Sequence, residues 1–163
     1  MGGWTPTDMV ARMFKSWIEL GHAHAFDVAL TPADEVARFI VARALVEDGP
    51  GRTWHVDAPH RHSMTEIAAR LAELGHPVRV VPYEDYRSIL AANLADPSIA
   101  GLFEILPERW DSTPYDRVRR VSCSRTQDAM RSSGATLPPL DRGLLERYVR
   151  TFQRAGFIRA ADR

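Results

Sequence analysis

Residues 26–40, FDVALTPADEVARFI, decide the fold because they join a strand pattern directly to a helix pattern. A short apolar run over residues 26–30 predicts a strand. Thr31 and Pro32 suit the entry of a helix over residues 32–46, since threonine caps helices and proline fits the first turn. The residues that this helix is expected to bury are Val36, Phe39 and Ile40.

The segment before it, residues 5–20, has the i, i+3/i+4 apolar spacing of an amphipathic helix. Thr5 or Thr7 can cap this helix, and Pro6 suits its first turn. Gly21 is expected to end it. The chain therefore begins with a helix that leads into the strand and helix of residues 26–40.

The segment after it predicts a second unit of strand, helix and strand. Residues 53–57, TWHVD, read as a strand, and residues 78–82, VRVVP, read as another. Between them Ser63 and Glu66 have the spacing of a capping box, and Gly75 ends the helix. The three elements predict a parallel βαβ unit.

The remaining residues predict further helices and little else. The helices are expected over 83–93, 99–106, 126–133 and 141–155, with a turn over 47–51, a loop over 107–120 and a short strand over 118–123. The expectation is an α+β fold, mostly helical, with a small parallel βαβ element. We expect one domain over residues 1–163, since the sequence shows no repeat and no long linker.

Composition excludes several classes of function. The 163 residues carry a formal net charge of zero, so neither nucleic acid nor an anionic membrane is expected as a partner. No apolar run approaches the roughly 20 residues that a membrane helix needs. Cys123 is the only cysteine, which excludes an internal disulfide and favours a reducing, cytoplasmic location.

The chain lacks the motifs of a complete dinucleotide-dependent reductase. Its ten glycines form neither GxGxxG nor GxxGxxG. The only lysine is Lys15, and Ala11 lies four residues before it, so there is no Tyr-x-x-x-Lys pair. No cofactor is therefore expected for this chain alone.

Taken in order, the segments resemble the C-terminal part of thioester reductase domains, within the extended short-chain dehydrogenase family. The matching segments are Gly3-Trp4-x-x-x-Asp8, Leu30-Thr31-Pro32-Ala33-Asp34-x-Val36-Ala37, Thr53-Trp54-His55-Val56 with Val78-Arg79-Val80-Val81-Pro82-Tyr83, and the series Thr126, Gly134, Pro138, Asp141 and Gly156-Phe157. Such domains terminate nonribosomal peptide and polyketide assembly lines and form the reductive half of carboxylic acid reductases. The resemblance implies that NADPH binds only with an N-terminal half, which these residues do not include.

The resemblance also implies a substrate pocket beside the first helix. Trp4, Asp8, His22 and His24 flank the two ends of that helix, and Pro32 begins the next one. These five residues are the candidate pocket for a small thioester or aldehyde. His22 or His24, with Asp8 as the carboxylate, is the candidate general base. The alternative is that Trp4 anchors the core and the histidines are solvated.

Three further features have a functional and a structural interpretation. The pairs His22-Ala-His24 and His60-Arg-His62 could chelate a metal. Both pairs are expected in loops beside helix ends, where surface or helix-capping histidines are the usual case. No metal is therefore expected. Cys123 could be a nucleophile activated by the helix that follows, or a buried structural cysteine. Residues 110–115, WDSTPY, could form a lid or cap the core.

Arginines are clustered near the C-terminus. One cluster is Arg117, Arg119, Arg120 and Arg125, and a second contains Arg142, Arg147, Arg150 and Arg154. Arg147, Arg150 and Arg154 share one face of the last predicted helix, which is either a docking surface for an acidic carrier protein or an ordinary solvated face.

Two functions remain open. The first is a binding module, the part of a thioester reductase that faces the substrate and an acyl or peptidyl carrier protein in a bacterial biosynthetic pathway. The second is a free-standing, cofactor-independent cyclase or isomerase that acts on a reactive aldehyde, imine or thioester.

Overall fold

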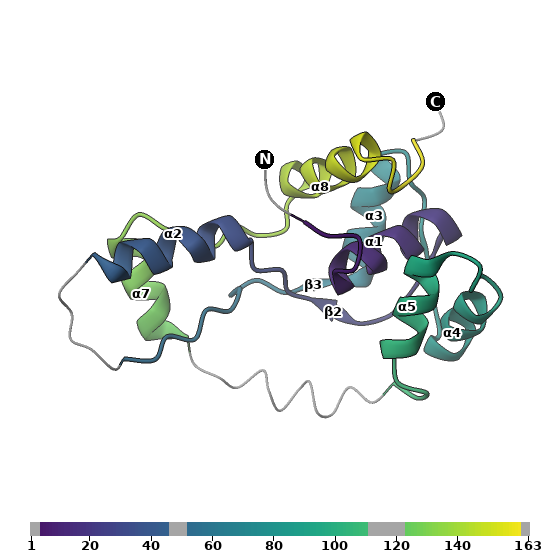
Figure 1. Ribbon diagram of the computed structural model, residues 1–163, viewed down its shortest axis with the longest axis horizontal. Coiled ribbons are helices and arrows are strands. Elements are labelled where there is room, and N and C mark those ends of the chain that lie inside the picture. The colour runs from purple at the N-terminus through teal and green to yellow at the C-terminus, as the bar shows by residue number, and fades with distance from the viewer. Residues whose placement is uncertain (1–3, 46–51, 111–122, 161–163) are drawn as a thin grey trace. The chain divides into compact units, whose positions relative to one another are not determined.

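A computed structural model shows a chain that is mostly helical (Figure 1). It also carries two small sheets of two strands each. The residues that the structure describes are 4–45, 52–110 and 123–160. This architecture confirms the α+β class and the small parallel element. The predicted turn over 47–51 lies outside the described residues, as do most of the predicted loop over 107–120 and of the strand over 118–123.

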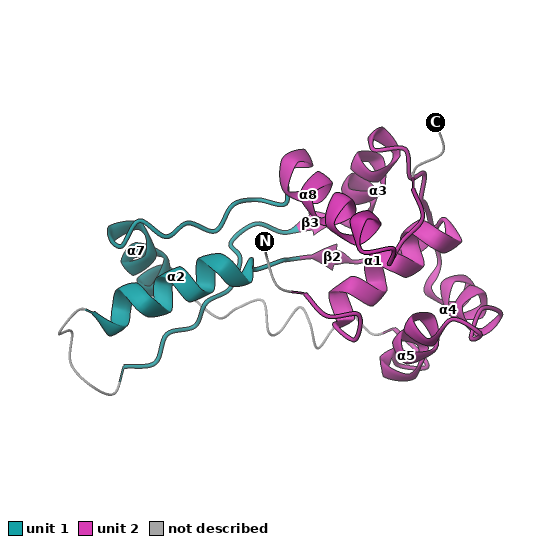
Figure 2. Cartoon of the chain, turned by 45° about the horizontal axis from the view of Figure 1, so that its top comes forward, with its two compact units in different colours: residues 1–2, 29–61, 113–140 teal, residues 3–28, 62–112, 141–163 magenta. Residues whose placement is uncertain are grey.

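The chain divides into two compact units (Figure 2). Unit 1 comprises residues 1–2, 29–61 and 113–140, and unit 2 comprises residues 3–28, 62–112 and 141–163. The prediction of one domain stays a prediction, because a unit defined by its contacts need not fold alone.

Unit 2 begins with helix α1, Met9–Leu20, which starts later than the sequence pattern predicts. The Asp8 carboxylate accepts a hydrogen bond from the backbone N–H of Ala11 at 3.1 Å and so caps the helix. The expected cap at Thr5 or Thr7 is wrong. Their hydroxyls bond each other at 2.9 Å within the turn that precedes the helix. Gly21 ends α1 with a φ of 66°, as predicted.

The two sheets of unit 2 pair segments that lie far apart in the sequence. Strand β1, His22–His24, runs parallel to β4, Arg79–Val81, with Ala23 opposite Val80. Strand β2, Asp27–Val28, runs antiparallel to β3, His62–Ser63. The predicted strand over 78–82 is therefore real, but its parallel partner is β1. The expected pairing with residues 53–57 is wrong, because that segment joins neither sheet.

The helices that follow confirm most of the capping signals. Helix α3, Met64–Glu73, has the complete Ser63/Glu66 capping box. Helix α4 spans Tyr83–Ala91, and α5 spans Pro97–Ile105. The last helix, α8, spans Arg142–Arg154 and is capped by Asp141, whose carboxylate accepts from the Leu144 N–H at 2.8 Å.

The core of unit 2 is aromatic along α1 and α8. The Phe14 ring lies 5.1 Å from that of Trp17 and 6.0 Å from that of Phe152. Phe14 is fully buried, and the Tyr86 hydroxyl is hydrogen-bonded to the Ser16 hydroxyl at 2.6 Å. This core fixes α1, and with it the candidate site residues at the two ends of that helix.

Unit 1 is smaller and consists of helix α2, Ala33–Ala44, helix α7, Ser124–Ser132, and extended chain. Phe39, Met130 and Ala135 form its buried cluster, against which Trp54 and Val56 pack. The expected Thr31 cap is wrong, because Pro32 occupies the cap position and the Thr31 hydroxyl instead accepts from the Ala58 N–H at 3.2 Å.

The sequence also predicts that α2 buries Ile40, and this is wrong. Ile40 is 59% exposed, whereas its neighbour Phe39 is buried in the core of unit 1. The core of unit 1 is small, and the residues in and against it include Phe39, Trp54 and Val56 but not Ile40.

Candidate functional site

Trp4 lies in unit 2 and packs against aromatic rings of the C-terminal segment. Its ring centroid is 4.8 Å from that of Phe152 and 4.8 Å from that of Phe157. The edge-on contact with Phe152 is a favourable geometry for aromatic pairs. Trp4 therefore ties the start of the chain to α8, as the core-anchor interpretation expects.

Asp8 and His22 stand at opposite ends of α1. One Asp8 carboxylate oxygen is occupied by the helix N-terminus. His22 is half-buried, and its Nδ1 lies 2.6 Å from the carbonyl oxygen of Leu20. The 12 residues of α1 separate the two positions by about 18 Å along the helix axis. Asp8 therefore cannot orient the His22 ring directly.

His24, the last residue of β1, is only 2% exposed and is enclosed by aromatic side chains. Its ring stacks on Phe26 at 4.4 Å and meets the edges of Tyr83 at 5.0 Å and Trp110 at 4.6 Å. Tyr86 completes the enclosure at 5.2 Å. This aromatic enclosure is built entirely from unit 2.

The enclosure leaves the imidazole without hydrogen bonds. Neither ring nitrogen of His24 has a partner among the described residues. Burial lowers the pKa of His24 to about 4, because the charged imidazolium would lose its hydration. His24 is consequently a neutral base at pH 7, and the aromatic rings that enclose it offer no carboxylate to orient it.

Sequence reasoning missed the partners of His24. Tyr83 and Tyr86 are three residues apart, so they share one face of α4, and that spacing was the available signal. Trp110 follows α5 and carries no periodic pattern that would place it beside β1. The long-range pairing of β1 with β4 brings these residues together.

The predicted pocket of Trp4, Asp8, His22, His24 and Pro32 stays a prediction. Trp4 and Asp8 precede α1, whereas His22 and His24 follow it. Pro32 belongs to unit 1, where it is buried at the N-cap of α2.

The remaining candidates are the metal-binding histidines and Cys123. His62 is buried in β3, with its Nδ1 3.2 Å from the Arg70 guanidinium. Within residues 4–45, 52–110 and 123–160, no three His, Cys, Asp or Glu side chains gather where they could hold a metal ion. Cys123 is buried at the N-cap position of α7, without a side-chain capping bond.

The described residues include no glycine turn from a strand into a helix that would suit the pyrophosphate of NADPH. Pyrophosphate binding requires glycines where a strand enters a helix, so that backbone N–H groups point at the phosphates. The glycines with positive φ here, Gly21, Gly75, Gly134 and Gly156, all follow helix C-termini. The parallel strand β4 enters α4 through Pro82, which has no N–H.

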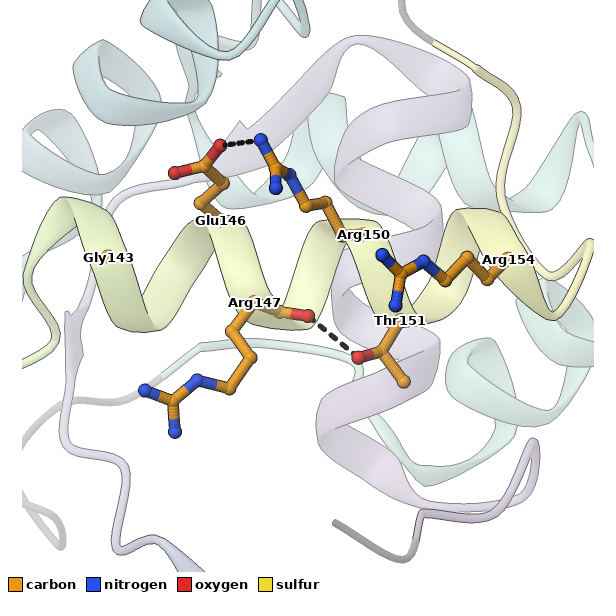
Figure 3. A pocket seen from close by; sticks show the side chains of 6 residues that line it. All are labelled: Gly143, Glu146, Arg147, Arg150, Thr151 and Arg154. Atoms are coloured by element: carbon orange, nitrogen blue, oxygen red, sulfur yellow. Dashed lines mark hydrogen bonds and ion pairs between the residues drawn. The ribbon is translucent and has the colours of Figure 1, made fainter. Parts of the chain in front are cut away.

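The arginine face of α8 consists of Arg147, Arg150 and Arg154, which line a shallow hollow of about 260 Å³ together with Gly143, Glu146 and Thr151 (Figure 3). Arg150 pairs with Glu146 at 2.5 Å, whereas the Arg147 side chain extends away from that pair. No ion pair of Arg147 or Arg154 occurs within the described residues. The face is exposed and carries more positive than negative charge.

Comparisons with known proteins identify the fold. No protein-family model matches the chain. The terminal R domain of the myxalamid PKS-NRPS biosynthetic pathway has a TM-score of 0.79 and 24% identity, over 99% of this chain and 42% of that one. A thiolation-reductase di-domain from an archaeal non-ribosomal peptide synthetase has a TM-score of 0.72 and 20% identity, over 96% and 33%.

One curated protein adds sequence similarity. The isonitrile lipopeptide synthase of Streptomyces coeruleorubidus is 27% identical over 127 residues, which are 73% of this chain and 8% of that protein. The chain thus has the fold of part of a terminal reductase domain, which confirms the predicted resemblance. It spans less than half of each of these three proteins, and a shared fold does not by itself assign an activity.

The described helices include none that is long and apolar enough to cross a membrane.

Proposed function

We propose that this chain is the substrate- and carrier-protein-facing part of a thioester reductase in nonribosomal peptide or polyketide biosynthesis, without reductase activity of its own. One observation carries the proposal: nearly the whole chain matches 42% of a solved terminal reductase domain, yet its described glycines and strand-to-helix junctions do not suit a dinucleotide. This combination supports the inference that the chain corresponds to the part of the reductase fold outside the cofactor site.

The arginine face of α8 is the proposed docking surface for the carrier protein. Carrier proteins present an acidic helix, and exposed arginines complement such a helix electrostatically. Arg147, Arg150 and Arg154 repeat at i, i+3 and i+7 and project into solvent.

The test measures, by calorimetry at several salt concentrations, how tightly the purified chain binds the cognate carrier protein loaded with phosphopantetheine. We expect micromolar affinity that weakens with salt, because exposed charges are screened within about 10 Å at 0.1 M. The double reversal Arg147→Glu/Arg150→Glu should weaken binding by about tenfold, the loss expected for two exposed charge contacts.

The matched control is Arg109→Glu/Arg131→Glu, which changes the net charge equally at exposed positions outside α8. Equal losses in both double variants would assign the effect to net charge and reject the docking face. The chain alone should also show no saturable NADPH binding. Micromolar NADPH affinity would contradict the proposal that the chain has no reductase activity of its own.

The alternative function, a cofactor-independent cyclase or isomerase, is supported by His24. A buried histidine whose nitrogens lack partners and whose pKa is low is a neutral base at pH 7. Turnover of an aldehyde or thioester by the isolated chain would favour this function. If His24 is its base, His24→Phe should lower turnover by at least about a hundredfold while the fold is kept.

A further inference from the structure

Unit 1 has an apolar helix face that its own core does not cover. The face runs along α2 as the apolar stripe, defined by the exposed residues Ala37, Ile40, Val41, Ala44 and Leu45. Their spacing is i, i+3, i+4, i+7 and i+8, which places them on one side of the helix. Ile40 and Val41 are each 59% exposed, and Leu45 is 80% exposed.

The other side of α2 already packs against unit 1. Phe39 is buried against Trp54, with ring centroids 5.7 Å apart, and Arg43 lies over the same indole at 4.9 Å. Glu35 accepts from the backbone N–H of Thr136 at 3.2 Å. A helix with apolar residues on its outer side as well as its inner side has the composition of a helix covered from both sides.

A second feature of unit 1 is the extended segment of residues 53–57. Trp54 and Val56 are half-buried on the core, whereas Thr53, His55 and Asp57 are exposed, which is the alternation of a strand with one covered face. The backbone of these residues makes no hydrogen bond to any other described residue. The segment therefore has the pattern of a strand but pairs with no strand among residues 4–45, 52–110 and 123–160.

We infer that the apolar stripe and residues 53–57 form one interface, and that its occupant is the part of a terminal reductase domain that this chain does not cover. A partner strand paired with residues 53–57 would extend into a sheet, and the layer that flanks such a sheet would lie beside α2. The solved terminal R domain supplies the argument for this occupant, because this chain matches only 42% of it.

The interface is independent of the carrier-docking proposal, since it rests on unit 1 and on the fold alone. It predicts the chemistry of the partner, which should offer an open strand edge next to an apolar helix surface. The inference concerns the surface and holds for a partner in the same polypeptide or in another.

The experiment mixes the purified chain with the source organism's polypeptide segment that aligns with the uncovered part of the terminal reductase domain. We expect a one-to-one complex by sedimentation and calorimetry. Ile40→Glu/Val41→Glu should weaken it at least a hundredfold, because two buried apolar contacts are replaced by charges. Ile105→Glu, at a 52% exposed position of α5, is the control and should leave affinity unchanged.

Hydrogen exchange provides the second readout, which does not depend on any variant. Amides of residues 53–57 should exchange at least tenfold more slowly in the complex than in the free chain. Failure to form a complex overturns the inference, as does a complex in which these amides stay unprotected or Ile40→Glu/Val41→Glu binds normally. Dimerisation of the free chain that the stripe variant abolishes would assign the surface to a second copy instead. Carrier affinity should be unaffected by the stripe variant, so the two proposals fail separately.

Discussion

Units 1 and 2 differ in how many of their helix starts are capped, strands paired and apolar faces covered within the unit. In unit 2 the helices α1, α3, α5 and α8 have side-chain N-caps, and both short sheets pair their strands within the unit. In unit 1 neither α2 nor α7 has such a cap, residues 53–57 have no strand partner among the described residues, and α2 exposes an apolar stripe. This contrast supports the inference that a partner completes unit 1.

The largest expected effect is a loss of stability that distinguishes the core of unit 2 from that of unit 1. Phe14→Ala should lower the free energy of unfolding by about 3–5 kcal/mol, because the fully buried ring leaves a cavity among Trp17, Tyr148 and Phe152. Phe39→Ala, in the small cluster of unit 1, should mainly increase local exchange there. Urea denaturation and residue-resolved hydrogen exchange check both. Equal global losses would show that the two cores unfold as one.

The next effect is a pH dependence that arises in unit 2. Folding lowers the pKa of His24 from 6.5 to about 4, so the unfolded chain binds the extra proton between these values. Stability is therefore complete above pH 6.5 and falls as the pH drops towards 4, by about 3 kcal/mol for this group. The measurement is urea denaturation from pH 7.5 to 4.

His24→Phe is the matched variant for this prediction, since it keeps an aromatic ring inside the enclosure and removes the titrating group. The difference in stability between the two proteins should change with pH over this range, which isolates His24 from the carboxylates. A constant difference would mean that the imidazole is solvated.

A smaller effect tests the caps. Asp8→Ala and Asp141→Ala should each cost about 1 kcal/mol of stability, because each removes the acceptor for a backbone N–H at a helix start. Asp34→Ala, in the first turn of α2, should cost less, because within the described residues the Asp34 carboxylate accepts only from the adjacent Glu35 N–H. A loss for Asp34→Ala as large as for the other two would place a true cap in unit 1.

The smallest effect concerns the stripe in the free chain. Ile40→Ser should change the free energy of unfolding by less than about 0.5 kcal/mol, as is usual for an exposed side chain. A loss of 2 kcal/mol or more would show that the chain itself covers Ile40 in solution.

The local signals in the sequence predicted local structure well. The Ser63/Glu66 capping box, the Asp141 cap and the glycines that end α1 and α8 all occur as their spacing predicts. The pairing of His22–His24 with Arg79–Val81 could not be predicted, since two three-residue strands carry almost no information about each other. Residues 53–57 have the alternating pattern of a strand, but a strand also needs a pairing partner, and the pattern does not specify one.

The candidate site shows the same division. The arginine face was predictable from helical spacing, whereas the enclosure of His24 depends on β1, α4 and Trp110 meeting in space. Trp4 and Asp8 were identified as candidate pocket residues, and the structure gives each a structural partner, Phe152 and the N-terminus of α1.

Hydrogen exchange on the chain alone tests the central claim that unit 1 is incomplete. The account predicts strong protection of the amides within α1, α3 and α8, together with near-intrinsic exchange for residues 53–57, whose backbone has no hydrogen-bond partner in the described chain. Protection of residues 53–57 comparable to that of β1 and β4, in a monomeric sample without any partner, would contradict it.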